Sequence, residues 1–230
     1  MTEKRSNRRS GPRRVPTSRQ LLLGSMVLLA AALVLPVWST RMEAPQYRNE
    51  EALQVHVYAG RVEGDVAEIQ TLNQYVGVAL PLDTPELHAM PWVLGGLLAA
   101  TLLVWSLPLR ARPAGTLLLW LTMTATAIGG GALLQYRLYQ MGHVRTRTIL
   151  EGVPDFTPPI LGSAKIANFT VHMSLGAGGW GYGLAMVLVA FALFAARAEK
   201  RIARAGGSAE SVHRSERDTA PAAHFVETEG

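Results

Sequence analysis

Residues 87–109 read LHAMPWVLGGLLAATLLVWSLPL, a run of 23 residues without Asp, Glu, Lys or Arg. A helix needs about 20 apolar residues to cross a hydrocarbon core about 30 Å thick. This run is therefore long enough to form a membrane-spanning helix.

Three further stretches are also uncharged, at residues 20–40, 113–136 and 166–196. Only 17% of the chain is charged, which is low for a soluble domain. The sequence predicts an all-α membrane protein with four transmembrane helices and a small mixed segment outside. We place the crossings at residues 20–40, 89–109, 116–136 and 172–197. Segments 41–88 and 137–171 then lie on one side, and segments 1–19, 110–115 and 198–230 on the other.

The charges predict which side is cytoplasmic, because cytoplasmic segments carry an excess of Lys and Arg. Residues 1–19 hold seven basic residues and one acidic residue, whereas residues 41–88 hold three basic and eight acidic residues. Segment 137–171 is the exception, with more basic than acidic residues. We expect both termini in the cytoplasm of a bacterium and the protein in its inner (plasma) membrane. The basic N-terminus then meets anionic lipid, not nucleic acid.

Two further features narrow the class of protein. The chain has no cysteine, which excludes disulfides, thiolate metal sites and covalent haem attachment. The first apolar run is long for a signal peptide and lacks a small-residue cleavage site, so we interpret it as a retained anchor.

Segment 41–88 is long enough to fold. Residues 53–58, LQVHVY, alternate between apolar and polar as a strand does. After turns at Gly60 and at Gly64-Asp65, residues 66–76 have helical spacing. We expect a strand, a turn and a short amphipathic helix that rests on the membrane or on segment 137–171, which prolines make irregular. The glycines at 129–131 and 176–183 predict close helix packing in the outer leaflet, and the tail from residue 198 is expected to be disordered.

Histidine and methionine recur in pairs where crossings meet the outer surface. The tentative metal ligands are His88, Met90, Met141, His143, His172 and Met173. Imidazole and thioether together suit copper. Haem is the alternative metal centre, with His172 as its axial ligand at the head of the glycine-rich helix. The same residues also have an ordinary explanation, because histidine suits interfaces and methionine fills apolar gaps. His56 is a weaker candidate.

Residues 57–65, VYAGRVEGD, and 68–77, EIQTLNQYVG, resemble a family of small bacterial polytopic membrane proteins associated with nitrous oxide reductase and other copper-respiratory gene clusters. The resemblance implies an accessory role in copper-enzyme maturation or electron supply. Gln74 and Val78 stand where that family has histidine and methionine, so two potential ligands are missing here.

These observations favour an accessory protein over an enzyme, and they indicate no catalytic residue. Its outward face is expected to handle copper or to dock a protein partner of a membrane complex. The alternatives are an electron-transfer subunit that carries haem or contacts quinol, and a structural platform without a ligand. We further predict that at least two of His88, His143 and His172 approach each other in a joint site.

Overall fold

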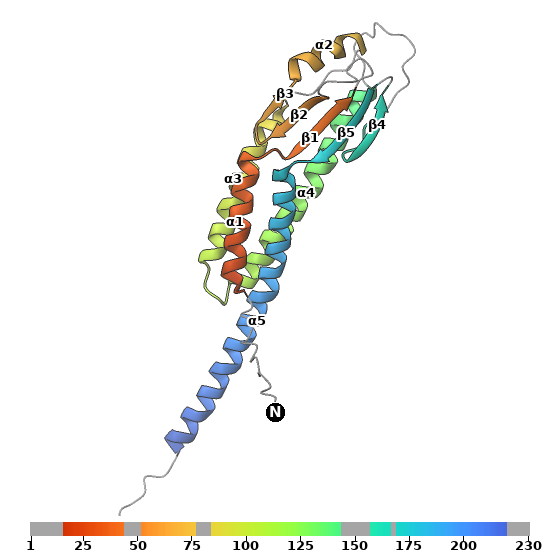
Figure 1. The fold of residues 1–230 in the computed structure, drawn as a ribbon. Helices are drawn as coiled ribbons and strands as arrows, with labels where there is room; N and C mark the ends of the chain where they lie inside the picture. Colours follow the sequence, from red (N-terminus) through yellow and green to blue (C-terminus); the bar gives the residue numbers. More distant parts are fainter. Residues whose placement is uncertain (1–15, 44–51, 77–83, 144–156, 167–168, 220–230) are drawn as a thin grey trace, which may run out of the picture.

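The computed structural model describes residues 16–43, 52–76, 84–143, 157–166 and 169–219. Four helices lie side by side, and a five-stranded sheet with a short helix stands at one end of them (Figure 1). The long helices are α1 (Ser18–Val34), α3 (Pro85–Ser106), α4 (Arg112–His143) and α5 (Ala177–Thr219). By length and composition, α3, α4 and α5 are long and apolar enough to cross a membrane, whereas α1 is a shorter apolar helix of 17 residues.

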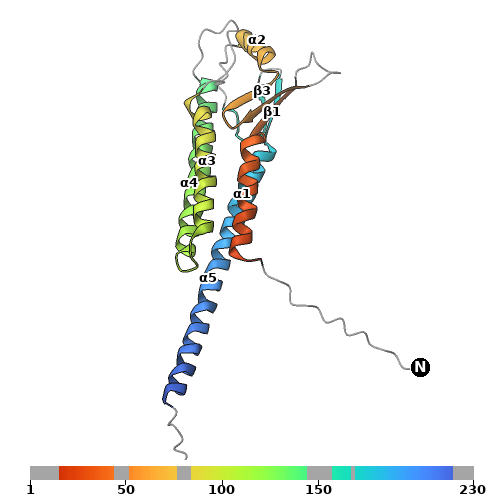
Figure 2. The same ribbon diagram turned by 90° about the vertical axis from the view of Figure 1, so that its left-hand side faces the viewer.

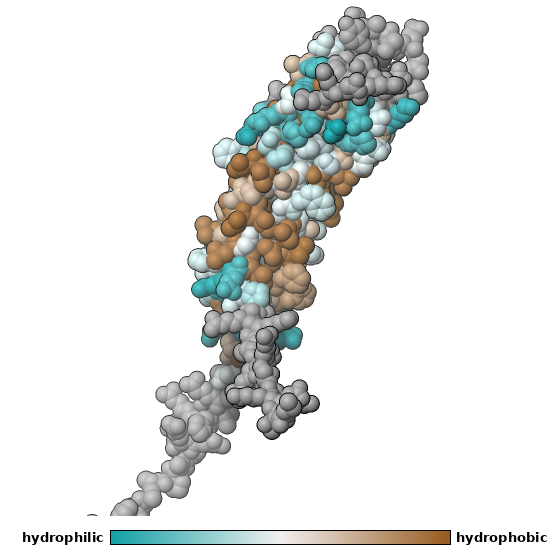
Figure 3. Space-filling view, viewed as in Figure 1, coloured by the Kyte–Doolittle hydropathy of each residue, from teal (hydrophilic) through white to brown (hydrophobic). Residues whose placement is uncertain are grey.

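Helix α1 packs against α3 and α5, and α4 packs against the same two helices, so the four form a closed bundle (Figure 2). Its core is made of aliphatic side chains from all four helices, among them Leu22, Leu97, Leu119 and Val189. Large apolar side chains also cover the outside of the bundle, such as Val27, Leu118 and Phe194. In Figure 3 the apolar residues form a band over the bundle, with hydrophilic residues over the sheet and at the opposite end. A helix bundle that is apolar both inside and outside is typical of a membrane environment.

The sheet was not predicted, and it shortens two of the four predicted crossings. Helix α1 ends at Val34, before Pro36, and β1 (Trp38–Glu43) follows where the first crossing was expected to continue to residue 40. The predicted fourth crossing began at residue 172, but β5 (Phe169–Leu175) occupies that position and α5 begins at Ala177. Helices α3 and α4 begin before residues 89 and 116, where their crossings were expected to start, and α4 continues beyond the expected residue 136 to His143. Helix α5 continues to Thr219, through much of the tail that was expected to be disordered.

All pairs in the sheet are antiparallel, in the order β3-β2-β1-β5-β4. The edge strands are β3 (Arg61–Gly64) and β4 (Gly162–Ile166), and β2 (Leu53–Tyr58) lies between β3 and β1. The predicted strand at residues 53–58 is confirmed, as is the turn at Gly60, whose φ of 86° favours glycine. The predicted helix at residues 66–76 is confirmed as α2 (Val66–Val76).

The sheet has one apolar face and one polar face, because successive side chains on a strand point to opposite sides. Leu53 and Val55 on β2 are buried against Ile69 of α2, with Met42 of β1 packed beside them. Helix α2 therefore packs on the apolar face of the sheet, at the end far from the bundle (Figure 1).

The sheet joins the bundle through its two inner strands, since β1 follows α1 and β5 leads into α5. Gly176 donates its N–H to the carbonyl of Val37 at 3.0 Å, and Gly178 donates to the carbonyl of Pro36 at 2.8 Å. A Cβ atom on Gly178 would lie 2.7 Å from the Leu35 carbonyl oxygen, so this approach requires glycine. The close packing expected of the 176–183 glycines is found at Gly176, Gly178 and Gly179 but not at Gly183, where a Cβ atom would meet nothing within 4 Å. The glycines at 129–131 differ, because a Cβ atom there would meet open space.

Candidate functional site

Six polar residues form a grid on the exposed face of the three central strands. Ser39 of β1 lies between His56 of β2 and Ser174 of β5, and Arg41 lies between Gln54 and His172. Directly opposed residues on neighbouring strands have Cβ atoms about 5 Å apart. Each outer residue of the grid is therefore a neighbour of either Ser39 or Arg41.

The polar grid surrounds a shallow cavity of about 260 Å³. His56 Nδ1 lies 2.9 Å from the Ser39 hydroxyl oxygen, which fixes the orientation of its ring. Arg41 meets Glu43 through Nε at 3.4 Å, and both side chains are about half exposed. Such exposed ion pairs contribute at most about 1 kcal/mol, so Glu43 does not immobilise the guanidinium.

The structure places all four outside histidines at the sheet end of the molecule. His56 and His172 lie on strands, His88 lies in the first turn of α3, and His143 is the last residue of α4. The residues that line the cavity include His56 and His172 but neither His88 nor His143. The expected proximity of two among His88, His143 and His172 stays a prediction.

Within each predicted His–Met pair, the two side chains do not face each other. His172 is exposed on the polar face, whereas Met173 is 6% exposed and belongs to the apolar face. His88 and Met90 are two residues apart on a helix, as are Met141 and His143, and residues at that spacing do not face each other. Among the described residues, no group of three or more His, Asp or Glu is placed to hold a metal ion.

Two of these histidines have local surroundings that differ from the predicted ones. The His143 ring stacks on Tyr139 with centroids 4.0 Å apart, and its Nδ1 lies 3.0 Å from the Tyr139 carbonyl oxygen. His172 was expected at the head of a helix, which was the basis of the haem alternative. It lies on β5, outside the helices, so that basis is not found, and the haem alternative itself stays a prediction.

Four residues of the grid were not predicted from the sequence as site residues: Ser39, Arg41, Gln54 and Ser174. The signal was present as alternation in residues 170–175, TVHMSL, where Thr170, His172 and Ser174 are separated by apolar residues. We assigned that stretch to a crossing because it is uncharged and continuous with the apolar helix that follows. When an uncharged strand directly precedes an apolar helix, composition alone does not separate the strand from the helix.

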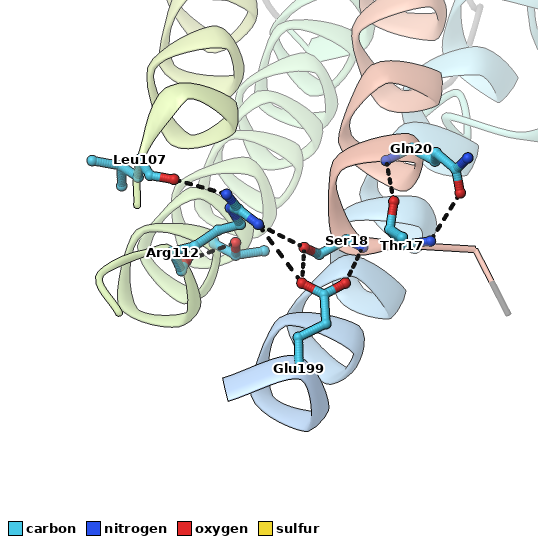
Figure 4. A network of polar contacts seen from close by, with 7 residues as sticks. Thr17, Ser18, Gln20, Leu107, Arg112 and Glu199 are labelled. Carbon is cyan, nitrogen blue, oxygen red and sulfur yellow. Dashed lines mark hydrogen bonds and ion pairs between the residues drawn. The ribbon is translucent and has the colours of Figure 1, made fainter. Parts of the chain in front are cut away.

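A second polar cluster lies at the opposite end of the bundle (Figure 4). Glu199 of α5 accepts hydrogen bonds from the backbone N–H and the hydroxyl of Ser18, both at 2.8 Å. Arg112 at the start of α4 donates to the Ser18 hydroxyl at 3.3 Å and to the Leu107 carbonyl at 2.9 Å, and it lies 3.7 Å from Glu199. These groups mainly bond one another and tie three helices together, so we assign the cluster a structural role.

No protein-family model matches this chain, and a comparison with curated proteins found no similar sequence. The resemblance to the copper-respiratory family therefore stays a prediction. Gln74 belongs to α2, and Val78 lies outside the described residues.

Proposed function

We propose that this protein is a non-enzymatic accessory protein of a bacterial inner membrane, which docks an extracytoplasmic partner on its sheet. The observation that carries the proposal is the polar grid, held at one end of an apolar bundle. The two strands at the centre of the sheet continue directly into α1 and α5, and the Gly176 and Gly178 hydrogen bonds fasten the junction. A partner on the sheet would therefore be held in a fixed orientation relative to the bilayer.

All four helices cross the membrane in this proposal. Helix α1 spans about 26 Å at 1.5 Å per residue, and the apolar Leu35 and Val37 extend it towards the interface. Leu23 and Val27 of α1 are exposed on the outside of the bundle, as are comparable residues of the three longer helices. A helix that packs along α3 and α5 and presents apolar side chains outward shares their environment.

The orientation follows from the charges at the end opposite the sheet. Arg19, Arg110 and Arg112 gather there with the basic residues of α5 that follow Ala196. Excess basic charge favours the cytoplasmic side. The sheet is then extracytoplasmic.

The docking experiment compares two arginine substitutions on opposite sides of the sheet. Gln54→Arg places a bulky cation within the polar grid, and Gln70→Arg places the same side chain on the exposed surface of α2. The protein is purified from native membranes in mild detergent, and its stoichiometric partners are identified by mass spectrometry. We expect a partner that is retained by Gln70→Arg and lost in Gln54→Arg. A stoichiometric partner retained equally by both variants, or found with neither variant nor wild type, would contradict docking on this face.

Copper handling is the second candidate function, because four histidines lie at the sheet end of the molecule. Titration of the purified protein with Cu(I) and Cu(II) tests it, with His88→Ala, His143→Ala and His172→Ala as variants. Saturable binding that one of these substitutions removes would favour copper. Binding that none of them alters would leave docking as the sole function.

A further inference from the structure

We propose that the polar grid on the sheet is a binding site for a phosphate group, either of free phosphate or of a phospholipid headgroup. The side chains of the grid are a guanidinium, two imidazoles, two hydroxyls and an amide, and all six can donate hydrogen bonds. No carboxylate belongs to the grid. Two carboxylates border the grid on the same face, Glu43 two residues from Arg41 on β1 and Glu63 directly opposite His56 on β3, and each of them is paired with an arginine.

Arg41 determines the charge of the site, because it is the one permanent cation of the grid and lies on the central strand. Guanidinium groups present several donors in a planar fork that matches phosphate oxygens. Glu43 meets Arg41 through Nε, so this ion pair does not involve the two terminal nitrogens, which can donate to a ligand. The hydroxyls of Ser39 and Ser174 and the imidazoles of the flanking strands then surround the remaining oxygens.

The same arrangement disfavours a metal cation between the two histidines. His56 and His172 lie two strands apart and two residues out of register. With a strand spacing of about 4.8 Å and a rise of about 3.4 Å per residue, their Cα atoms are about 12 Å apart. Both imidazoles would have to lean across Ser39 or Arg41 to share one ion. The guanidinium charge would oppose that ion.

The cavity also lies close to the expected level of lipid headgroups. Trp92 and Trp180 are 82% and 70% exposed near the sheet ends of α3 and α5, and exposed tryptophans favour the membrane interface. Ser174 precedes Trp180 by six residues. The volume of about 260 Å³ accommodates a group of several heavy atoms, since one water accounts for about 30 Å³ in the liquid. A lipid phosphate is therefore as suitable a ligand as a free one.

The experiment uses the full chain, purified in a phosphate-free maltoside detergent and titrated with inorganic phosphate by calorimetry. Arg41→Gln is the test variant and Arg61→Gln is the matched control. Arg61 lies on the same face at β3, pairs with a glutamate two residues on, and has a similar exposed fraction, 54% against 57% for Arg41. It does not line the cavity. We expect saturable binding that Arg41→Gln weakens at least about tenfold and Arg61→Gln leaves unchanged.

A second arm identifies the source of the phosphate group. Each protein is reconstituted in vesicles of phosphatidylcholine with phosphatidic acid, extracted, and analysed for retained lipid by native mass spectrometry. Retention of phosphatidic acid that depends on Arg41 but not on Arg61 assigns the site to a headgroup. The proposal is overturned if neither ligand binds, if both arginine variants weaken binding equally, or if Cu(II) or Zn²⁺ binds the grid and phosphate does not displace it. The outcome is independent of whether a protein partner docks on the sheet.

Discussion

Replacing Gly178 and Gly183 of α5 with alanine should change stability in opposite directions. Gly178 faces the end of α1, where a new Cβ atom would lie 2.7 Å from the Leu35 carbonyl oxygen and 3.1 Å from that of Pro36. Both are backbone atoms held by the α1–β1 junction, so they cannot move aside as a flexible side chain would. Gly183 lies in the same helix, and a Cβ atom there meets nothing within 4 Å.

The magnitudes follow from two competing effects. Alanine is favoured over glycine in a helix interior by up to about 1 kcal/mol, and overpacking costs about 1–3 kcal/mol. Gly183→Ala has only the first effect and should stabilise the protein by about 0.5–1 kcal/mol. Gly178→Ala has both, at a position in the first turn where the helical gain is small. It should destabilise the protein by about 1–2 kcal/mol.

The assay is equilibrium unfolding of the purified protein in mixed micelles of increasing SDS fraction, followed by circular dichroism and tryptophan fluorescence. Wild type, Gly178→Ala and Gly183→Ala are compared under identical conditions. If Gly178→Ala is as stable as wild type or more so, then α5 does not approach the end of α1 as described. The fixed attachment of sheet to bundle would then be refuted.

Three further substitutions test other parts of the structure. Glu199→Ala removes the acceptor of two Ser18 hydrogen bonds and the ion-pair partner of Arg112, and it should cost about 1–3 kcal/mol in the same unfolding assay. The neighbouring Lys200→Ala, which loses one exposed hydrogen bond to the Arg110 carbonyl, should cost less than about 0.5 kcal/mol. Leu118→Arg replaces a side chain that is 67% exposed on the bundle. In a bilayer it should cost about 2–4 kcal/mol and reduce membrane insertion, measured by glycosylation mapping, whereas an unchanged inserted fraction would argue against a lipid-facing α4. Trp38→Phe removes the 2.9 Å hydrogen bond from the indole to the Ile160 carbonyl and should destabilise the protein by about 1 kcal/mol; no change in the unfolding midpoint would show that this contact does not anchor β1.

The apolar helices were predictable from composition, because an uncharged run of 20 or more residues has few alternatives to a helix. The strand at residues 53–58 and helix α2 were predictable as well, since their periods of 2 and 3.6 stand in a polar segment. The turn at Gly60 followed from the glycine itself.

Strands β1 and β5 could not be separated from the crossings by composition. Trp38, Thr40 and Met42 alternate with Ser39 and Arg41. Residues 38–40, however, also complete the uncharged stretch that begins at Gln20. What decides their conformation is a pairing between residues about 130 positions apart. The alternation in each strand is a local signal, but the pairing that decides between strand and helix is not, so the polar grid on the sheet was not predicted. The His–Met pairs suggested shared metal sites for a related reason. Residues that are close in sequence need not lie on the same face of a strand or helix.

The central claim is that four helices cross the membrane and hold the sheet on the extracytoplasmic side. The chain has no cysteine, so single-cysteine variants can be labelled with a membrane-impermeant maleimide without interference. We expect Gln54→Cys on the sheet to react in intact spheroplasts, and Ser10→Cys and Arg201→Cys to react only after permeabilisation. Reaction of Ser10→Cys in intact spheroplasts would mean that α1 does not cross. Protection of Gln54→Cys until permeabilisation would place the sheet in the cytoplasm and contradict the account.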